Sequence, residues 1–343
     1  MNLKHVNGFC ILLACAALAF AQTPAASRHS GDWTIRASDI QGHVEFSLMD
    51  SEKEHRFNYS SDWPLTEFHG LDVSKAGHQE VSFKIVRDAG IFDCKGFLES
   101  GEGAGLFHFL ADDKYPQAMA GLGFNGIDGD KQFAMAIHDV SLKFAKEMKD
   151  EHLQGLDTDK LIAFKIFGVT VTFIHEIRAA GLDTSDCDKL VAFRIHGVSP
   201  EFVRDIHSAG VDMNDSDKFI AFRIHGVSPE MIRALRKSGY TPDADKLIAM
   251  RIHGATPEWI SDLKKDGYDK IDLDKLIAFR IHGVSPEFIE KLQKLGYQHP
   301  EPDQLIAMRI HGVTPDFIST LRSRGMQDLS IDQLVNLRIH GID

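Results

Sequence analysis

The sequence predicts an α+β protein of two domains, in which a small antiparallel β domain precedes an all-α solenoid of helical hairpins. Two observations predict this division. Along residues 31–126, apolar and polar residues alternate with the two-residue period of half-buried strands. Along residues 130–343, one phrase of about 29 residues recurs, and such a period is typical of helical-repeat proteins.

Residues 1–21 have the features of a secretory signal peptide. They contain one lysine, an apolar run and a final Ala19–Phe20–Ala21, the small-x-small pattern that signal peptidase recognises. We therefore expect an extracytoplasmic protein, periplasmic or secreted, in which residues 22–30 form a linker. No later segment has the roughly 20 consecutive apolar residues of a transmembrane helix. An alternative is lipid anchoring at Cys15, because residues 12–15 loosely resemble a lipoprotein cleavage site.

The composition argues against nucleic acid and anionic lipid as partners. The formal net charge is −12, and an acidic chain has no general attraction for nucleic-acid phosphates or anionic lipids. Of the four cysteines, Cys10 and Cys15 lie in the expected signal peptide. We expect Cys94 and Cys187 to be buried free thiols, because they lie in different domains and neither lies in a basic pattern typical of an activated nucleophile.

Short segments of the β domain have the strand period. A last hairpin is expected in 91–110, where Gly101, Gly103 and Gly105 supply turn or bulge conformations between two aromatic-rich strands. Residues 62–72 are expected to cross over the sheet. The pattern does not distinguish a sandwich from a barrel. The other expected strands are 33–37, 43–49, 56–60 and 81–86.

Motifs of catalysis and of cofactor binding are not found. Gly121, Gly123 and Gly126 match the spacing of a dinucleotide-binding fingerprint, but no strand-helix-strand unit surrounds them, so we interpret the stretch as a linker. We expect no cofactor and no enzymatic activity. His69 and His108 are the notable polar candidates for a site in the β domain, and the simpler expectation is that they face the core as structural residues.

The repeated phrase is clear in "LIAFRIHGVSPEFI" at residues 276–289. Its glycine recurs at steps of 29 residues, with one step of 28, and Asp139 occupies the same position one step upstream. This gives about seven and a half copies. The recurring glycines are Gly168, Gly197, Gly226, Gly254, Gly283, Gly312 and Gly341.

Each copy divides into two helices. The first begins at an acidic cap and ends at the recurring glycine, which accepts a left-handed conformation. The second begins at a Ser or Thr cap, usually followed by Pro, and ends at a second glycine such as Gly296. The expected caps of the first helices include Asp188, Asp217, Asp245 and Asp274. Those of the second helices include Ser199, Ser228, Thr256, Ser285 and Thr314.

The first helix is too apolar to stand alone. At about 100° per residue, Leu276, Ile277, Phe279 and Ile281 cover an arc wider than an ordinary surface stripe. We expect this arc to be covered by neighbouring copies, because one hairpin of this size cannot cover it. Repetition is then a consequence of packing.

In six copies an arginine falls inside this arc. We expect each to pair with an acidic cap or a helix-terminal carbonyl, forming an arginine ladder that fixes the stacking register. The alternative is a row of anion-binding arginines. These residues are Arg194, Arg223, Arg251, Arg280, Arg309 and Arg338.

In six copies a histidine ends the first helix, and metal binding is an alternative role for these residues. Packed helices lie about 8–10 Å apart, whereas zinc ligands converge within about 2.1 Å, so we expect no metal site. A histidine at a helix C-terminus is also stabilised by the helix dipole. The acidic loops 183–188 and 212–217 lack the glycine and glutamate of a calcium loop. The histidines are His196, His225, His253, His282, His311 and His340.

The phrase D-x-D-K-L-I-A-F/M-R-I-H-G-V-S/T-P-E-F-I resembles tandem repeats of bacterial exported proteins. It is also similar to repeats appended to transmembrane metallopeptidases of the antibiotic-sensing regulator type. The resemblance covers residues 130–343, and the β domain resembles one that accompanies such repeats. It implies an extracytoplasmic sensing or docking role. Peptidase activity is not implied, because residues 175–179, "HEIRA", end in Ala where the second zinc-binding His is required.

A second resemblance is to the helix-hairpin-helix motif of DNA-binding proteins, through "RIHGVSPEFIEKL" at 280–292. Here Ser285 replaces the second glycine, and Glu287 stands where a basic or neutral residue would face phosphate. Nucleic-acid binding is therefore a remote alternative for this acidic chain.

The leading hypothesis is a non-enzymatic extracytoplasmic protein-interaction scaffold in envelope sensing or signalling. The alternative is a metal- or small-ligand-binding periplasmic sensor that uses the repeated His and Arg residues. The copies differ mainly at outer positions of the second helices, where we expect a protein partner to bind; a freely varying solvated face is the alternative interpretation. The basic residues there are Arg204, Arg233, Arg236, Lys237, Lys264, Lys265, Lys291, Lys294 and Arg322.

Overall fold

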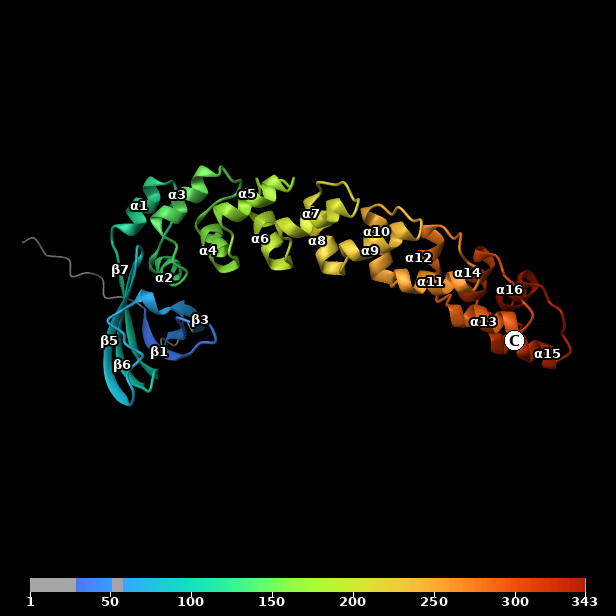
Figure 1. Ribbon diagram of the computed structural model, residues 1–343, viewed down its shortest axis with the longest axis horizontal. Coiled ribbons are helices and arrows are strands. Elements are labelled where there is room, and N and C mark those ends of the chain that lie inside the picture. Colours follow the sequence, from blue (N-terminus) through green and yellow to red (C-terminus); the bar gives the residue numbers. More distant parts are fainter. Residues whose placement is uncertain (1–28, 51–57, 343) are drawn as a thin grey trace, which may run out of the picture. The chain divides into compact units, whose positions relative to one another are not determined.

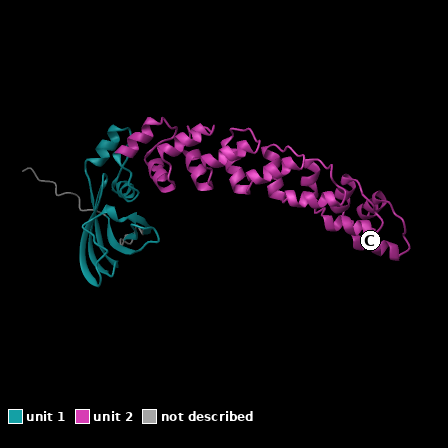
Figure 2. Ribbon diagram, in the orientation of Figure 1, with its two compact units in different colours: residues 1–142 teal, residues 143–343 magenta. Residues whose placement is uncertain are grey.

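The computed structural model describes residues 29–50 and 58–342 and confirms the α+β class: an antiparallel sheet is followed by helices (Figure 1). The chain forms two compact units, residues 1–142 and residues 143–343 (Figure 2). The expected signal peptide and Cys15 lie outside the described residues. Among the described helices, none is both long and apolar enough to span a bilayer.

Unit 1 is built on one curled, seven-stranded sheet with the order β3-β2-β1-β7-β6-β5-β4. Strands β3 and β4 lie at opposite edges, yet only the short 3-10 helix Leu65–Glu67 joins them, so the sheet must curl to bring its edges together. The rings of Trp63 and Phe68 lie 6.1 Å apart. A two-sheet sandwich is therefore excluded. The strands are β1 (Ser30–Ala37), β2 (His43–Asp50), β3 (Asn58–Pro64), β4 (Phe68–His69), β5 (His78–Arg87), β6 (Gly90–Glu99) and β7 (Glu102–Ala111).

The predicted strands 33–37, 43–49 and 81–86 lie within β1, β2 and β5, and the predicted hairpin is β6–β7. The predicted strand at 56–60 falls partly outside the described residues. The expectation for Gly103 and Gly105 was wrong, because both lie inside β7 rather than in a turn or bulge. A side chain on either would run into the backbone of β6, so glycine permits the close approach of the two strands.

The core of unit 1 is aromatic. Trp33, Phe46 and Phe83 point to the buried face of the sheet. Helix α2 (Gly129–Ile137) covers part of this face, where Phe133 lies 5.2 Å from the ring of Phe109. The first helical element of the repeat register thus packs on the sheet, and α1 (Tyr115–Gly121) precedes it.

Unit 2 is a row of paired helices in which each first helix packs beside the first helix of the next copy. Figure 2 shows this succession as one magenta run. The first helices are α4 (Thr158–Phe167), α6 (Cys187–His196), α8 (Ser216–His225), α10 (Ala244–His253), α12 (Leu273–His282), α14 (Pro302–Ile310) and α16 (Ile331–Ile339). The second helices are α3 (Leu142–Asp150), α5 (Val171–Ala179), α7 (Pro200–Ser208), α9 (Pro229–Lys237), α11 (Pro257–Lys265), α13 (Pro286–Lys294) and α15 (Pro315–Ser323).

Helix ends follow the predicted chemistry with one correction. The Ser and Thr caps of the second helices are confirmed, as is the left-handed conformation of the recurring glycines, with φ between 69° and 74°. The acidic caps of the first helices were placed two residues too late. In α12 the cap is Asp272, which accepts the amide of Lys275 at 2.8 Å, while Asp274 lies in the first turn. The other corrected caps are Asp186, Asp215 and Asp243.

The wide apolar arc of the first helix is covered only in part. Leu276, Ile277 and Phe279 are buried, as expected. Ile281 was expected to be covered too, but it is 52% exposed. It lies about 140° around the helix from Leu276, so the neighbouring copies that bury Leu276 and Phe279 do not reach it.

Cys94 and Cys187 are free and buried, as predicted. Burial raises the pKa of Cys187 to about 11, and burial raises the pKa of Cys94 further. Both thiols are therefore protonated at neutral pH, and neither has the thiolate character of a nucleophile.

These burial differences predict unequal effects of truncation. Leu276→Ala should lower the free energy of unfolding by about 2–5 kcal/mol, because it removes buried carbons and leaves a cavity. The matched change Ile281→Ala, five residues away, should lower it by less than about 1 kcal/mol. Urea denaturation measures both losses of free energy. Equal losses would contradict the difference in burial between Leu276 and Ile281.

Candidate functional site

In five copies, an arginine reaches back to the first helix of the preceding copy. The Nε of Arg280 donates to the carbonyl of His253 at 3.1 Å, and this carbonyl is one that the end of α10 leaves without an intrahelical partner. A cation at a helix C-terminus is favoured by the helix dipole. The same bond joins Arg194 to Phe167, Arg223 to His196, Arg251 to His225 and Arg309 to His282, at 2.9–3.3 Å.

Most of these guanidinium groups also lie over an aromatic ring of the preceding copy. Arg280 lies 5.2 Å from the ring centroid of Trp259. Met231 occupies the equivalent ring position below Arg251, which keeps its carbonyl bond. Stacking adds about 0.5–1 kcal/mol at an exposed site. The other stacked pairs are Arg194 with Phe173, Arg223 with Phe202, Arg309 with Phe288 and Arg338 with Phe317.

The left-handed backbone explains the recurring glycine, and the arginine contact adds a second reason. Gly254 has a φ of +73°, and a Cβ placed there would lie 2.8 Å from Nη2 of Arg280. Any larger residue at this position would meet both backbone strain and the guanidinium. Glycine therefore ends the helix and makes room for the arginine of the next copy.

A second ladder joins the opposite ends of the first helices, and the sequence reasoning missed it. Lys275 pairs with Asp303 of the next copy, where the lysine is 34% exposed and the aspartate 76% exposed. Each such surface pair contributes about 0–1 kcal/mol. The ladder stops at α14, because Gln304 stands where the earlier copies have lysine. The other pairs are Lys160–Asp188, Lys189–Asp217, Lys218–Asp245 and Lys246–Asp274.

The basic residues of the second helices do not gather into one cluster. Three of them bond the last carbonyls of the preceding second helix: Arg236 to Gly210, Lys264 to Ser238 and Arg322 to Leu295. Lys237 is exposed. The remaining five pair with acids of their own helices: Arg204–Glu201, Arg233–Glu230, Lys265–Asp262, Lys291–Glu287 and Lys294–Glu290.

The histidines do not converge. Each recurring histidine lies at the C-terminal end of its own first helix and is partly or largely exposed. Within residues 29–50 and 58–342, no three His, Cys, Asp or Glu side chains come together as a metal site. In unit 1, His69 and His108 are exposed rather than core-facing, which corrects the expectation. His108 borders a groove of about 640 Å³ that Phe97 also lines.

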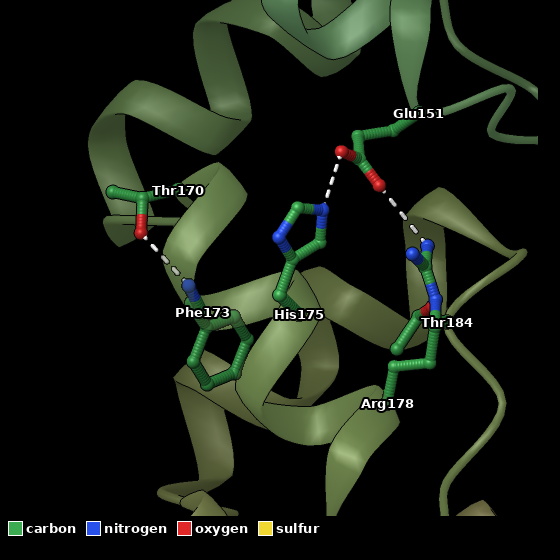
Figure 3. A network of polar contacts seen from close by, with 6 residues as sticks. All are labelled: Glu151, Thr170, Phe173, His175, Arg178 and Thr184. Carbon is green, nitrogen blue, oxygen red and sulfur yellow. Dashed lines mark hydrogen bonds and ion pairs between the residues drawn. The ribbon is translucent and has the colours of Figure 1, made fainter.

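A polar network ties the first two second helices of unit 2 together (Figure 3). Glu151, only 12% exposed, accepts Nε2 of His175 at 2.7 Å and Nη2 of Arg178 at 3.1 Å. Nε of Arg178 also donates to Thr184 at 2.9 Å. The glutamate thereby joins the end of α3 to α5, and we interpret the network as a structural brace.

The most regular exposed feature of unit 2 is a row of isoleucines. One isoleucine per copy, at the position of Ile281, projects from the last turn of each first helix and is 51–56% exposed. Single exposed apolar residues are ordinary on protein surfaces, but these isoleucines recur at one register position in seven successive first helices. This isoleucine row consists of Ile166, Ile195, Ile224, Ile252, Ile281, Ile310 and Ile339.

An acidic edge lies at the N-terminal ends of the first helices, whereas the isoleucine row lies near their C-terminal ends. It consists of the five ladder aspartates, which are 72–76% exposed, and the acidic caps that precede them. In α12, for example, Asp272 and Asp274 accompany the single cation Lys275. The edge therefore carries an excess of negative charge.

Comparison with models of known protein families and with curated proteins finds no match to this chain.

The arginine ladder predicts a graded loss of stability. Arg280→Ala should lower the free energy of unfolding by about 1–3 kcal/mol, because it leaves a helix-end carbonyl without its partner and removes the stacking on Trp259. Arg251→Ala should cost about 0.5–1 kcal/mol less, because Met231 replaces the ring. Urea denaturation of both variants provides the comparison. An equal or reversed order would contradict the contribution of the ring.

Proposed function

We propose that this protein is a non-enzymatic scaffold that binds another protein through the isoleucine row. The single observation that carries the proposal is the presence of seven half-exposed isoleucines at one register position. Their side chains are not required for the buried core, which Leu276 and Phe279 and their equivalents form. A polar residue at the same position would leave the stack intact, so the apolar row is better explained by binding.

The two ladders that join the first helices support the same proposal. The arginine ladder fixes the C-terminal ends of the first helices, and the Lys–Asp ladder links their N-terminal ends. Side chains that are already held in position lose less conformational entropy on binding. A row of this kind is therefore suited to recognition along its length.

The alternatives receive less support from the geometry. Eight of the nine basic residues on the second helices already contact carbonyls or acids, so binding through them stays a weaker prediction. The acidic edge would repel nucleic-acid phosphates. We place the scaffold outside the cytoplasm, in envelope sensing or signalling, on the signal-peptide pattern of residues 1–21 and the repeat resemblance.

The proposal predicts a selective loss of partner binding. Immobilised protein should retain an envelope protein from extracts, and the triple change Ile224→Gln, Ile252→Gln and Ile281→Gln should abolish its retention. Glutamine preserves helix propensity at these exposed positions, so circular dichroism and thermal unfolding should match the unaltered protein.

A matched control separates the isoleucine row from the basic face. Arg204→Ser combined with Arg233→Ser alters exposed residues of the second helices and should leave retention unchanged. If the envelope protein is still retained after the isoleucine changes but is lost after the arginine changes, the binding site lies on the second helices.

A further inference from the structure

From the spacing and charge of the isoleucine row, we infer that its partner is an extended, basic polyproline II segment with an apolar residue at every third position. The inference rests on the proposed scaffold function and names the chemistry of the segment that lies on the row.

Spacing is the first argument. Packed helices lie about 8–10 Å apart, and each first helix of the row contributes one isoleucine at the same position. A polyproline II segment rises about 9.3 Å in each three-residue turn, so its every third side chain meets the next isoleucine. A β-strand repeats its face after about 6.7 Å. Over seven copies, a strand would lose register after the first few contacts.

Backbone chemistry is the second argument. A β-strand partner needs an open strand edge with unpaired amides and carbonyls. The described residues of unit 2 form helices, whose backbone groups are paired along the helix, and the row offers only side chains. Polyproline II has no internal hydrogen bonds and keeps its backbone solvated, so it binds such a surface without losing backbone partners.

Charge is the third argument, and it selects a basic segment. Asp274 lies seven residues before Ile281, about 10 Å away along the helix, within reach of a lysine or arginine beside the apolar residue of the partner. Two acids accompany one lysine at the start of α4, α6, α8, α10 and α12, so the edge has unneutralised charge. On the other flank, the guanidinium of Arg280 is bound to a carbonyl and a ring of its own chain.

Synthetic peptides test the inference on the full protein. The probe is a fluorescent peptide of seven Leu-Pro-Lys triplets, and its control has the same composition with irregularly spaced leucines. Fluorescence anisotropy should show that the regular peptide binds at least tenfold more tightly than the control. The triple Ile→Gln variant should bind it about a hundredfold more weakly, because three half-exposed isoleucines no longer become buried against the leucines. Added salt should weaken the binding.

Several outcomes would overturn the inference: no binding of the regular peptide, equal binding of the irregular control, equal binding of a Leu-Pro-Glu peptide, or binding unaffected by the isoleucine changes. Isoleucine-dependent binding to phosphatidylglycerol vesicles in place of the peptide would also overturn it, because the occupant would then be a lipid surface. If the peptide fails while an envelope protein still depends on the isoleucines, the scaffold proposal stands and only the partner chemistry is wrong. If both fail, neither stands.

Discussion

The bond from an arginine to the last carbonyl of the preceding first helix, present in five copies, is the interaction on which the repeat unit depends. It places a permanent cation at a helix end, where the dipole favours it, and lays the same cation over an aromatic ring in most copies. It also lies against the glycine at the helix end, where a φ of +73° at Gly254 favours glycine. Three features of the repeated phrase, the arginine, the glycine and the aromatic residue after Pro-Glu, are thus parts of one contact.

The Lys–Asp pairs complete this arrangement at the other ends of the first helices. Lys275 reaches forward to Asp303, whereas Arg280 reaches back to the preceding copy, so α12 is linked to both neighbours. Helices α6, α8 and α10 are linked in the same way. Polar groups link the helices at their ends, and the buried sides of the helices are apolar. The isoleucine side chain of the last turn is half exposed, so it is available for a partner.

The sequence predicts the repeat unit well because the residues that determine its helices and helix ends lie within one copy. The helices, the Ser and Thr caps and the left-handed glycines follow from residues within one copy. The acidic caps were placed two residues late because D-x-D offers two candidates, and only the neighbouring lysine distinguishes the capping aspartate from the paired one. Exposure of Ile281 depends on how far the adjacent copies reach, which one copy does not reveal. In the β domain the closure of the sheet was unpredictable, because it depends on pairing between distant strands and on a short link between its edges.

Arginine, carbonyl and ring together hold neighbouring copies in register. A double-mutant cycle with Arg280→Ala and Trp259→Ala measures the coupling of arginine and ring through the free energies of unfolding. We expect a coupling of about 0.5–1 kcal/mol for this pair, and a smaller one for Arg251 with Met231. Strictly additive effects for Arg280 and Trp259 would contradict it, because the two residues would then stabilise the stack independently.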